Sequence, residues 1–172
     1  GAWRESREDT TLRRVRLLKK RGEDDRALEV VQKQLYRAVA QTLERLTLLM
    51  EAQTDAHDAL QIAQIYRQAE AIFSMGGSMS DGLMMEQYLK LGETDAALCC
   101  RKRLSDGAVG PGMTPNPILF APTISPRTQE NQMPRAWRAM FLRGLREEKA
   151  LDGLRETPIY RDAVSRPEAS LK

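Results

Sequence analysis

The sequence predicts an all-α fold, and three observations lead to this prediction. Helix-forming residues such as Leu, Ala, Glu and Arg dominate the chain, whereas aromatic residues make up only 5% of it. Apolar residues recur at spacings of three and four over long stretches, which is typical of one helix face. Gly22 and Gly92 interrupt this pattern where a helix would end in a left-handed residue. A chain of 172 residues is long enough for one domain with a substantial core.

The first expected helix covers residues 10–21 and has one basic side. Its apolar side consists of Leu12, Val15, Leu17 and Leu18. Four of its cations are candidate contacts for RNA or another phosphate-bearing surface, including a membrane: Arg13, Arg16, Lys19 and Lys20. The plainer interpretation is a solvated helix whose cations near the C-terminal end favour the helix dipole.

The second expected helix runs from Asp25 to about Glu51, because no Gly or Pro interrupts this stretch. Seven residues form a seam with nearly heptad spacing along it: Leu28, Val31, Leu35, Ala38, Thr42, Leu46 and Leu49. Such a helix would be roughly 40 Å long. We expect the seam to pack within the chain. Packing against another chain would instead make a homo-oligomeric coiled coil.

A third helix is expected to begin after Thr54 or Asp55, either of which can cap it, and to reach about Phe73. Its apolar face would consist of Ala59, Ile62, Ala63, Tyr66, Ala69 and Phe73. The only histidine, His57, lies in its first turn. Since no metal-ligating residue stands at a suitable spacing, we expect His57 to be a surface residue.

Two short helices are expected on either side of Gly92. Leu83, Tyr88 and Leu91 share one face of the first, and Leu98 and Leu104 share one face of the second. Thr94 or Asp95 can cap the second helix. A hairpin this short cannot bury its apolar face alone, so the pattern predicts stacked neighbouring helices.

This stretch, residues 79–116, resembles a pentatricopeptide repeat. The residues that carry the resemblance are Tyr88, Gly92, Asp95, Ala97, Leu98, Leu104, Gly112, Pro115 and Asn116. The tetratricopeptide repeat shares the turn but lacks the Gly-x-x-Pro-Asn ending. A weaker echo lies at residues 10–35, where Gly22 to Leu28 mirrors Gly92 to Leu98 at an offset of 70 residues, twice the 35-residue period of the family.

The resemblance implies stacked helical hairpins, a mitochondrial or plastid location, and single-stranded RNA as a ligand. In the family, a polar residue early in the first helix reads a base together with one at the end of the repeat. Asn116 fits the end position, but the early position falls at Leu83, where the family has Asn, Ser or Thr. The resemblance therefore implies the fold without the base-reading code.

Residues 107–134 are expected to form an extended arm, because the prolines and glycines that recur in this stretch are incompatible with a continuous helix or a central strand. Its apolar residues are the expected partner-binding anchor of the arm: Ile118, Leu119, Phe120 and Ile124. The surface that the arm covers could belong to this chain or to a neighbour. The expected organisation is thus a helical-hairpin domain at 1–106, the arm at 107–134, and a C-terminal helix and tail at 135–172.

The last expected helix begins at Pro134, carries Trp137, Phe141 and Leu145 on its apolar side, and ends at Thr157-Pro158. The tail that follows is expected to pack against the domain over a short stretch and then to extend away from it at Arg166-Pro167.

The sequence shows no arrangement of residues that is typical of an enzyme, a cofactor site or a metal site. Cys99 and Cys100 are adjacent, so we expect them to stay unpaired in a reducing compartment. No apolar run is long enough for a transmembrane helix. We therefore expect a non-catalytic structural or adaptor subunit of a larger protein or ribonucleoprotein assembly. The alternatives are a single-stranded RNA-binding protein and, more weakly, a homo-oligomeric coiled coil.

Overall fold

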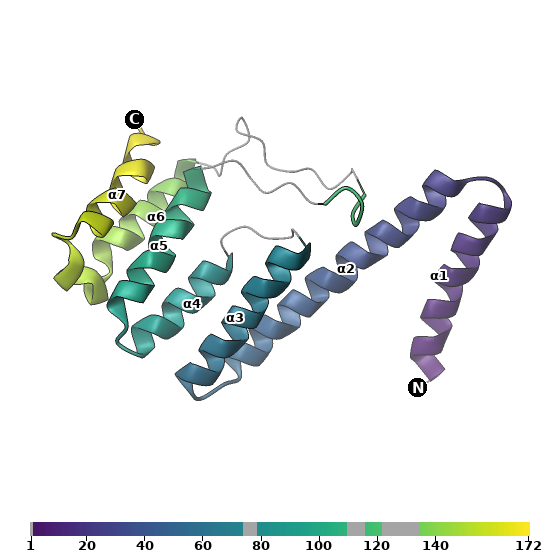
Figure 1. Ribbon diagram of the computed structural model, residues 1–172, viewed down its shortest axis with the longest axis horizontal. Helices are drawn as coiled ribbons and strands as arrows, with labels where there is room; N and C mark the ends of the chain where they lie inside the picture. Colours follow the sequence, from purple (N-terminus) through teal and green to yellow (C-terminus); the bar gives the residue numbers. More distant parts are fainter. Residues whose placement is uncertain (1, 74–78, 110–115, 122–134) are drawn as a thin grey trace.

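The computed structural model of the chain describes residues 2–73, 79–109, 116–121 and 135–172 (Figure 1). Helices account for most of these residues, and the described part of the chain contains no strand. This confirms the predicted all-α class. None of the described helices is long and apolar enough to cross a membrane.

The helices follow one another as a stack in which neighbours in the chain pack together (Figure 1). α2 packs on α3, α3 on α4, α4 on α5, and α5 on both α6 and α7. α1 packs against the beginning of α2 and then projects away from the stack (Figure 1). The bounds are α1 Ala2–Lys20, α2 Asp24–Glu51, α3 Ala56–Phe73, α4 Met79–Lys90, α5 Thr94–Val109, α6 Arg135–Glu147, the 3₁₀ helix η1 Lys149–Leu154, and α7 Pro158–Ala169.

Three apolar clusters form the core along this stack. The first joins α2 to α3 through Val39, Leu43 and Tyr66. The second joins the end of α2 to α3, α4 and α5, and consists of Met50, Ala59, Ala63, Met84 and Cys100. The third joins α5 to α6, η1 and α7, and consists of Leu98, Leu145, Leu151, Tyr160 and Ala163. The clusters follow one another along the stack, so the core extends from α2 to α7 instead of forming one central cluster.

The turns at Gly22 and Gly92 are built in the same way. Both glycines have φ of 74°. The amide of Gly92 donates to the carbonyl of Leu89 at 3.1 Å, and the next amide, of Glu93, donates to Tyr88 at 2.9 Å. This pair of hydrogen bonds is the Schellman arrangement, which needs a left-handed residue after the helix. The predicted role of both glycines as helix-ending residues is confirmed.

Replacing Gly92 by Ala is expected to lower the free energy of unfolding by about 1 kcal/mol, because a Cβ is disfavoured at positive φ. No atom lies within 4 Å of the place that the added methyl group would occupy, so the cost comes from the backbone alone. Gly153→Ala is the matched control, since that glycine also has open space around it but does not have positive φ. Urea unfolding followed by circular dichroism compares the two variants, and equal stabilities would contradict the left-handed turn.

The extents of α2 and α3 match the sequence-based expectation, but the extents of α1 and α5 do not. The carboxylate of Asp55 caps α3 by accepting from the amides of His57 and Asp58 at 2.7 and 3.2 Å. α1 begins well before residue 10. α5 continues to Val109, so the expected start of the arm at residue 107 is wrong. The carboxylate of Asp106 accepts from Lys102 and Arg166, which fastens this end of α5 to its own helix and to α7.

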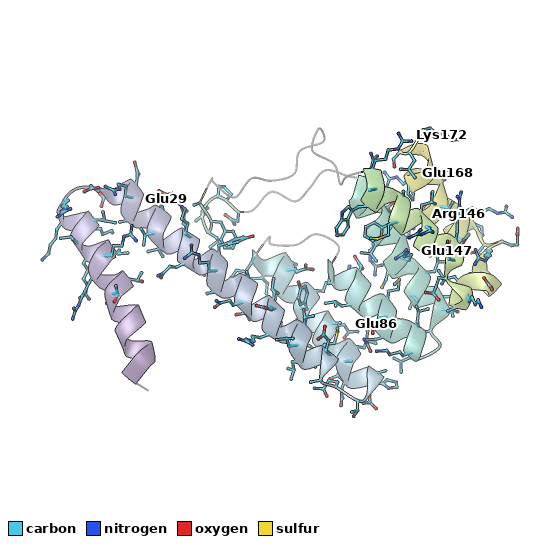
Figure 2. The ribbon with its side chains drawn as sticks, turned by 180° about the vertical axis from the view of Figure 1, so that it is seen from behind. Glu29, Glu86, Arg146, Glu147, Glu168 and Lys172 are labelled. Carbon is cyan, nitrogen blue, oxygen red and sulfur yellow. The ribbon has the colours of Figure 1, made fainter. Side chains whose placement is uncertain are left out.

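The expected single helix after Pro134 is also wrong. α6 ends at Glu147, and Glu148 is extended with ψ of 102° before η1 begins. Thr157-Pro158 begins α7 instead of ending a helix, because the Thr157 hydroxyl caps the amide of Tyr160 at 3.3 Å and Pro158 tolerates the first helical position. The tail does not leave at Pro167, which is buried inside α7. An ion pair between Arg146 and Glu168, 2.7 Å long, joins α6 to α7 (Figure 2).

The expected packing of the α2 seam within the chain is wrong for five of its seven members. Leu28, Val31, Ala38, Thr42 and Leu49 are exposed. The buried face of α2 consists of Ala27, Gln32, Val39, Leu43 and Met50. The helix carries two adjoining apolar stripes, and α3 covers the neighbouring stripe because one helix buries only one face against one partner.

The 70-residue offset between the two glycine turns spans α2, α3 and α4. Two repeats of two helices each would place four helices in that interval, whereas the structure has three. The chain still spans 70 residues because α2 is unusually long, at 28 residues.

Candidate functional site

Positive charge is concentrated where α1 turns into α2. Residues 10–37 contain nine Lys and Arg side chains against four carboxylates, a net charge of +5, whereas the whole chain has a net charge of +3. The remaining residues are therefore slightly acidic in sum. Leu18 of α1 and Ala27 of α2 are buried where the two helices meet, which fixes their approach. A concentrated basic surface of this kind attracts anionic partners.

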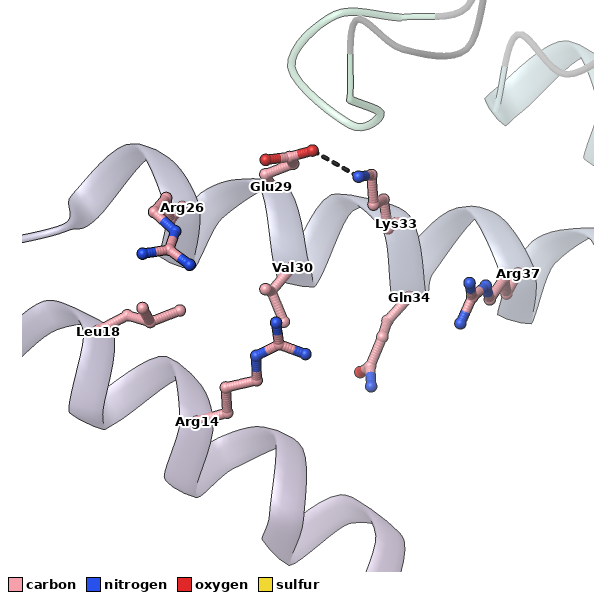
Figure 3. Close-up of a pocket in the computed structure, with 8 residues that line it drawn as sticks. All are labelled: Arg14, Leu18, Arg26, Glu29, Val30, Lys33, Gln34 and Arg37. Carbon is pink, nitrogen blue, oxygen red and sulfur yellow. Dashed lines mark ion pairs between the residues drawn. The ribbon is translucent and has the colours of Figure 1, made fainter.

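One side of this hairpin is hollowed into a basic pocket of about 280 Å³ (Figure 3). Arg14 of α1 and Arg26 of α2 point into the gap between the two helices, whereas Lys33 points away from it toward Glu29 (Figure 3). The pocket is lined by Arg14, Leu18, Arg26, Glu29, Val30, Lys33, Gln34 and Arg37. Leu18 and Val30 give it an apolar floor, and Gln34 donates to the hydroxyl of Thr11 at 2.5 Å across the gap.

Two of the four pocket cations are already paired. Lys33 bonds to Glu29 at 2.5 Å, and this hydrogen bond lowers the pKa of the Glu29 carboxyl. Arg26 pairs with Glu23 at the start of α2. Arg14 and Arg37 form no ion pair with any described side chain. They are therefore the pocket cations that are available to an anion.

The four cations singled out in the sequence do not gather in this pocket. Arg13, Arg16, Lys19 and Lys20 are all exposed, but none of them lines it. Lys19 lines a second recess, an apolar groove of about 460 Å³ on the α1–α2 hairpin. The pocket cations from α2 were missed, although Arg26, Lys33 and Arg37 stand at helical spacings of seven and four. This spacing is the signal that would have found them.

The apolar groove is lined by side chains of α1 and α2. Its lining consists of Val15, Lys19, Asp24, Asp25, Ala27, Leu28 and Val31. The lining contains two carboxylates, Asp24 and Asp25, and one cation, Lys19. Unlike the basic pocket, the groove therefore has no excess of positive charge. Further along α2, Ala38, Thr42 and Leu49 of the expected seam are also exposed.

The described part of the arm, residues 116–121, packs on α2. Gln32 donates to the carbonyls of Pro117 and Ile118 at 3.2 and 3.1 Å. Phe120 is buried and meets Tyr36 edge to face, with ring centroids 5.6 Å apart. Phe120 thus lies against α2 of the same chain, which is one of the two surfaces that the sequence left open for the arm. Ile118 is 80% exposed, Leu119 is half-buried, and Ile124 lies outside the described residues.

A polar cluster lies between α3, α4 and α5. Asp81 is buried and accepts from Arg103 at 2.6 Å, with Arg67 at 4.0 Å. Arg103 also donates to the sulfur of Cys100 at 3.2 Å. Burial raises the pKa of the Cys100 thiol, which works against an activated nucleophile. Both cysteines are free, as expected, and His57 is exposed. No group of metal-ligating side chains occurs among the described residues.

Glu70 of this cluster is expected to make stability fall as pH rises. Burial raises the pKa of its carboxyl, and Asp81 adds to this, while hydrogen bonds with Ser80 and the charge of Arg67 oppose it. A raised pKa in the folded state means that full stability is present below the unfolded pKa, about 4.3, and is lost as pH rises through the folded value.

Glu70→Gln should therefore gain stability over the natural chain as pH rises from about 4, and the gain should level off above the folded pKa. Urea unfolding at a series of pH values measures this difference. Glu86→Gln on the exposed side of α4 is the control. A pH-independent difference between Glu70→Gln and the natural chain would contradict the assignment.

No protein-family model, no curated protein and no solved structure matches this chain. The arrangement of its own helices and surfaces is the basis for the function proposed next.

Proposed function

We propose that this chain is a non-catalytic structural or adaptor subunit of a larger protein or ribonucleoprotein assembly. The observation that carries the proposal is the exposure of large apolar side chains on separate faces. Ile72 of α3 is 71% exposed, and Trp137 of α6 is 54% exposed. Ile65 and Met140 accompany them on the same two helices. Apolar side chains that gather on a surface mark contacts with other proteins.

The shape of the molecule supports this role. The stack presents α1 and α2 at one end and α6 and α7 at the other, as the positions of Glu29 and Lys172 show in Figure 2. Neighbours can therefore contact the two ends independently. The resemblance of residues 79–116 to pentatricopeptide repeats supports an organellar assembly, in a mitochondrion or plastid. Exposed Ile118 of the arm is a further candidate contact.

The proposal is tested in the native source with two variants. Ile72→Asp and Trp137→Asp should each shift the tagged chain from a large complex toward free chain on native gels and gradients, because a carboxylate cannot be buried in an apolar contact without a large cost. Gln68→Asp and Arg143→Asp are matched exposed controls on the same helices. A natural chain that sediments alone at its own mass of 19.5 kDa would refute the proposal.

A second candidate function is the binding of single-stranded RNA through its phosphates. The observation that favours it is the basic pocket together with the charge of +5 on residues 10–37. An arginine guanidinium can donate two parallel hydrogen bonds to the oxygens of one phosphate. Three of the four pocket cations are arginines. The apolar floor formed by Leu18 and Val30 leaves room for sugar or base contacts.

Fluorescence anisotropy with a labelled RNA single strand at two salt concentrations tests this second function. Arg14→Ala combined with Arg37→Ala should weaken binding about equally for different sequences and reduce the salt slope by roughly 2. Arg143→Ala combined with Arg161→Ala, on exposed positions of α6 and α7, is the control for total charge. Unchanged affinity and slope in the double variant, or no binding by the natural chain, would exclude this role for the pocket.

A further inference from the structure

A strip of apolar and small side chains along α2 is left uncovered by the other described helices. The strip consists of Leu28, Val31, Ala38, Thr42 and Leu49, and its three large members are 46–55% exposed. Leu35 and Leu46, which alternate with them, are half-buried at the edge of the core between α2 and α3. Together these positions step by three and four residues, which is the spacing by which one helix packs alongside another.

The first half of the strip is deepened by α1. Val15 of α1 joins Leu28 and Val31 of α2 in the apolar groove of about 460 Å³. An apolar groove between two helices is suited to a third helix that lies along it. The central members of the strip, Ala38 and Thr42, are small, so a crossing helix can approach closely there.

The charges on the strip point to the identity of that third helix. Asp24, Asp25 and Arg45 form no ion pair with any described side chain. Roughly 30 Å of helix separates Asp25 from Arg45, so they cannot meet within one chain. A second α2 that runs antiparallel brings its own Arg45 to the aspartates, and two-fold symmetry repeats the contact at the other end.

The spacing of the strip supports this antiparallel register. When Leu35 faces Ala38 of the second copy, Val31 faces Thr42 of that copy, and Leu28 faces its Arg45. Asp24 and Asp25 lie about one helical turn from Leu28, within reach of that guanidinium. At the centre of the contact a large side chain then faces a small one, Leu35 against Ala38 and Val31 against Thr42.

We propose that this strip is where a second copy of the chain binds, through antiparallel packing of α2 on α2. This proposal rests on the proposed scaffold function, because it assigns one face of the scaffold to a second copy of the chain. The other apolar surfaces, on α3 and α6, stay free for different neighbours. A helix from an unrelated protein is the competing occupant of the strip.

Sedimentation equilibrium of the purified full chain between about 1 and about 100 μM tests the proposal. The expected mass rises toward twice 19.5 kDa with concentration. Arg45→Asp should weaken the dimer roughly tenfold, and Asp24→Lys with Asp25→Lys should do the same, because each change sets like charges against one another. The three changes combined should restore the affinity of the natural chain, since the charges are then exchanged.

Val31→Glu places a carboxylate in the middle of the apolar contact and should abolish the dimer, whereas Ile72→Glu on the outer face of α3 should leave it intact. Circular dichroism verifies the fold of each variant. A monomer at all concentrations, or a dimer that neither Val31→Glu nor the charge exchange affects, would overturn the proposal. A monomeric chain whose native complex is still lost on Ile72→Asp would refute the dimer but leave the scaffold function standing.

Discussion

Leu145→Ala is expected to lower the free energy of unfolding by about 3 kcal/mol, within the range of about 2–5 kcal/mol for a buried leucine. Leu145 has 0% exposure and lies in the core that joins α5 to α6, η1 and α7. Its neighbours Leu98, Leu151 and Tyr160 come from three different elements, so they cannot collapse together into the space that the missing methyl groups leave. The variant therefore loses both the burial of the side chain and the close packing around it.

Urea unfolding followed by far-ultraviolet circular dichroism measures this loss. Leu48→Ala is the matched control, because Leu48 is on the exposed side of α2 and its truncation should change stability by no more than about 0.5 kcal/mol. The Tyr160 hydroxyl donates to the backbone carbonyl of residue 145 at 3.0 Å, and this bond survives the substitution. Losses of similar size at both leucines would contradict the packing of α6 against α5 and α7.

Gly144→Ala is expected to lower the free energy of unfolding by about 1–3 kcal/mol, although Gly→Ala inside a helix normally stabilises it by about 1 kcal/mol. A Cβ on Gly144 would clash with Nη2 of Arg101. That guanidinium donates to the carbonyl of Phe141 at 2.8 Å and lies over the Phe141 ring at 5.5 Å. The new methyl group would displace it and break both contacts.

The sign of the Gly144 effect should depend on Arg101. In an Arg101→Ala background the obstacle is gone, so Gly144→Ala should stabilise the chain by about 1 kcal/mol. A double-mutant cycle by urea unfolding measures this change of sign. Burial of the Arg101 guanidinium lowers its pKa, because the charged group is partly shielded from water. Additive effects of the two substitutions would mean that Arg101 does not pack against Gly144.

The local features of the fold could be predicted from the sequence. Gly22 and Gly92 ended helices as expected, and Asp55 capped α3, because the conformations of turns and caps depend on a few neighbouring residues. The same local reasoning failed at Pro158. Proline is compatible with both the end of one helix and the start of another, and packing against α5 decided in favour of α7.

The candidate site was predicted less well than the fold. The arm segment was expected to contain an apolar anchor, but the sequence does not say whose surface Phe120 contacts, and the structure places it against Tyr36. The basic character of residues 10–21 was visible in the sequence. The pocket itself requires Arg37 of α2 to lie near Arg14 of α1, two residues whose approach depends on the angle between the helices.

The sequence alone therefore determined α2, α3, the helix ends at Gly22 and Gly92 and the basic charge of residues 10–21, because helix periodicity and capping are set by residues close together in the chain. The tertiary structure alone decided which of the two apolar stripes of α2 is buried and which cations share a pocket. Both stripes have helical spacing, so only the position of α3, whose own apolar face contains Tyr66, distinguishes the covered stripe from the exposed one.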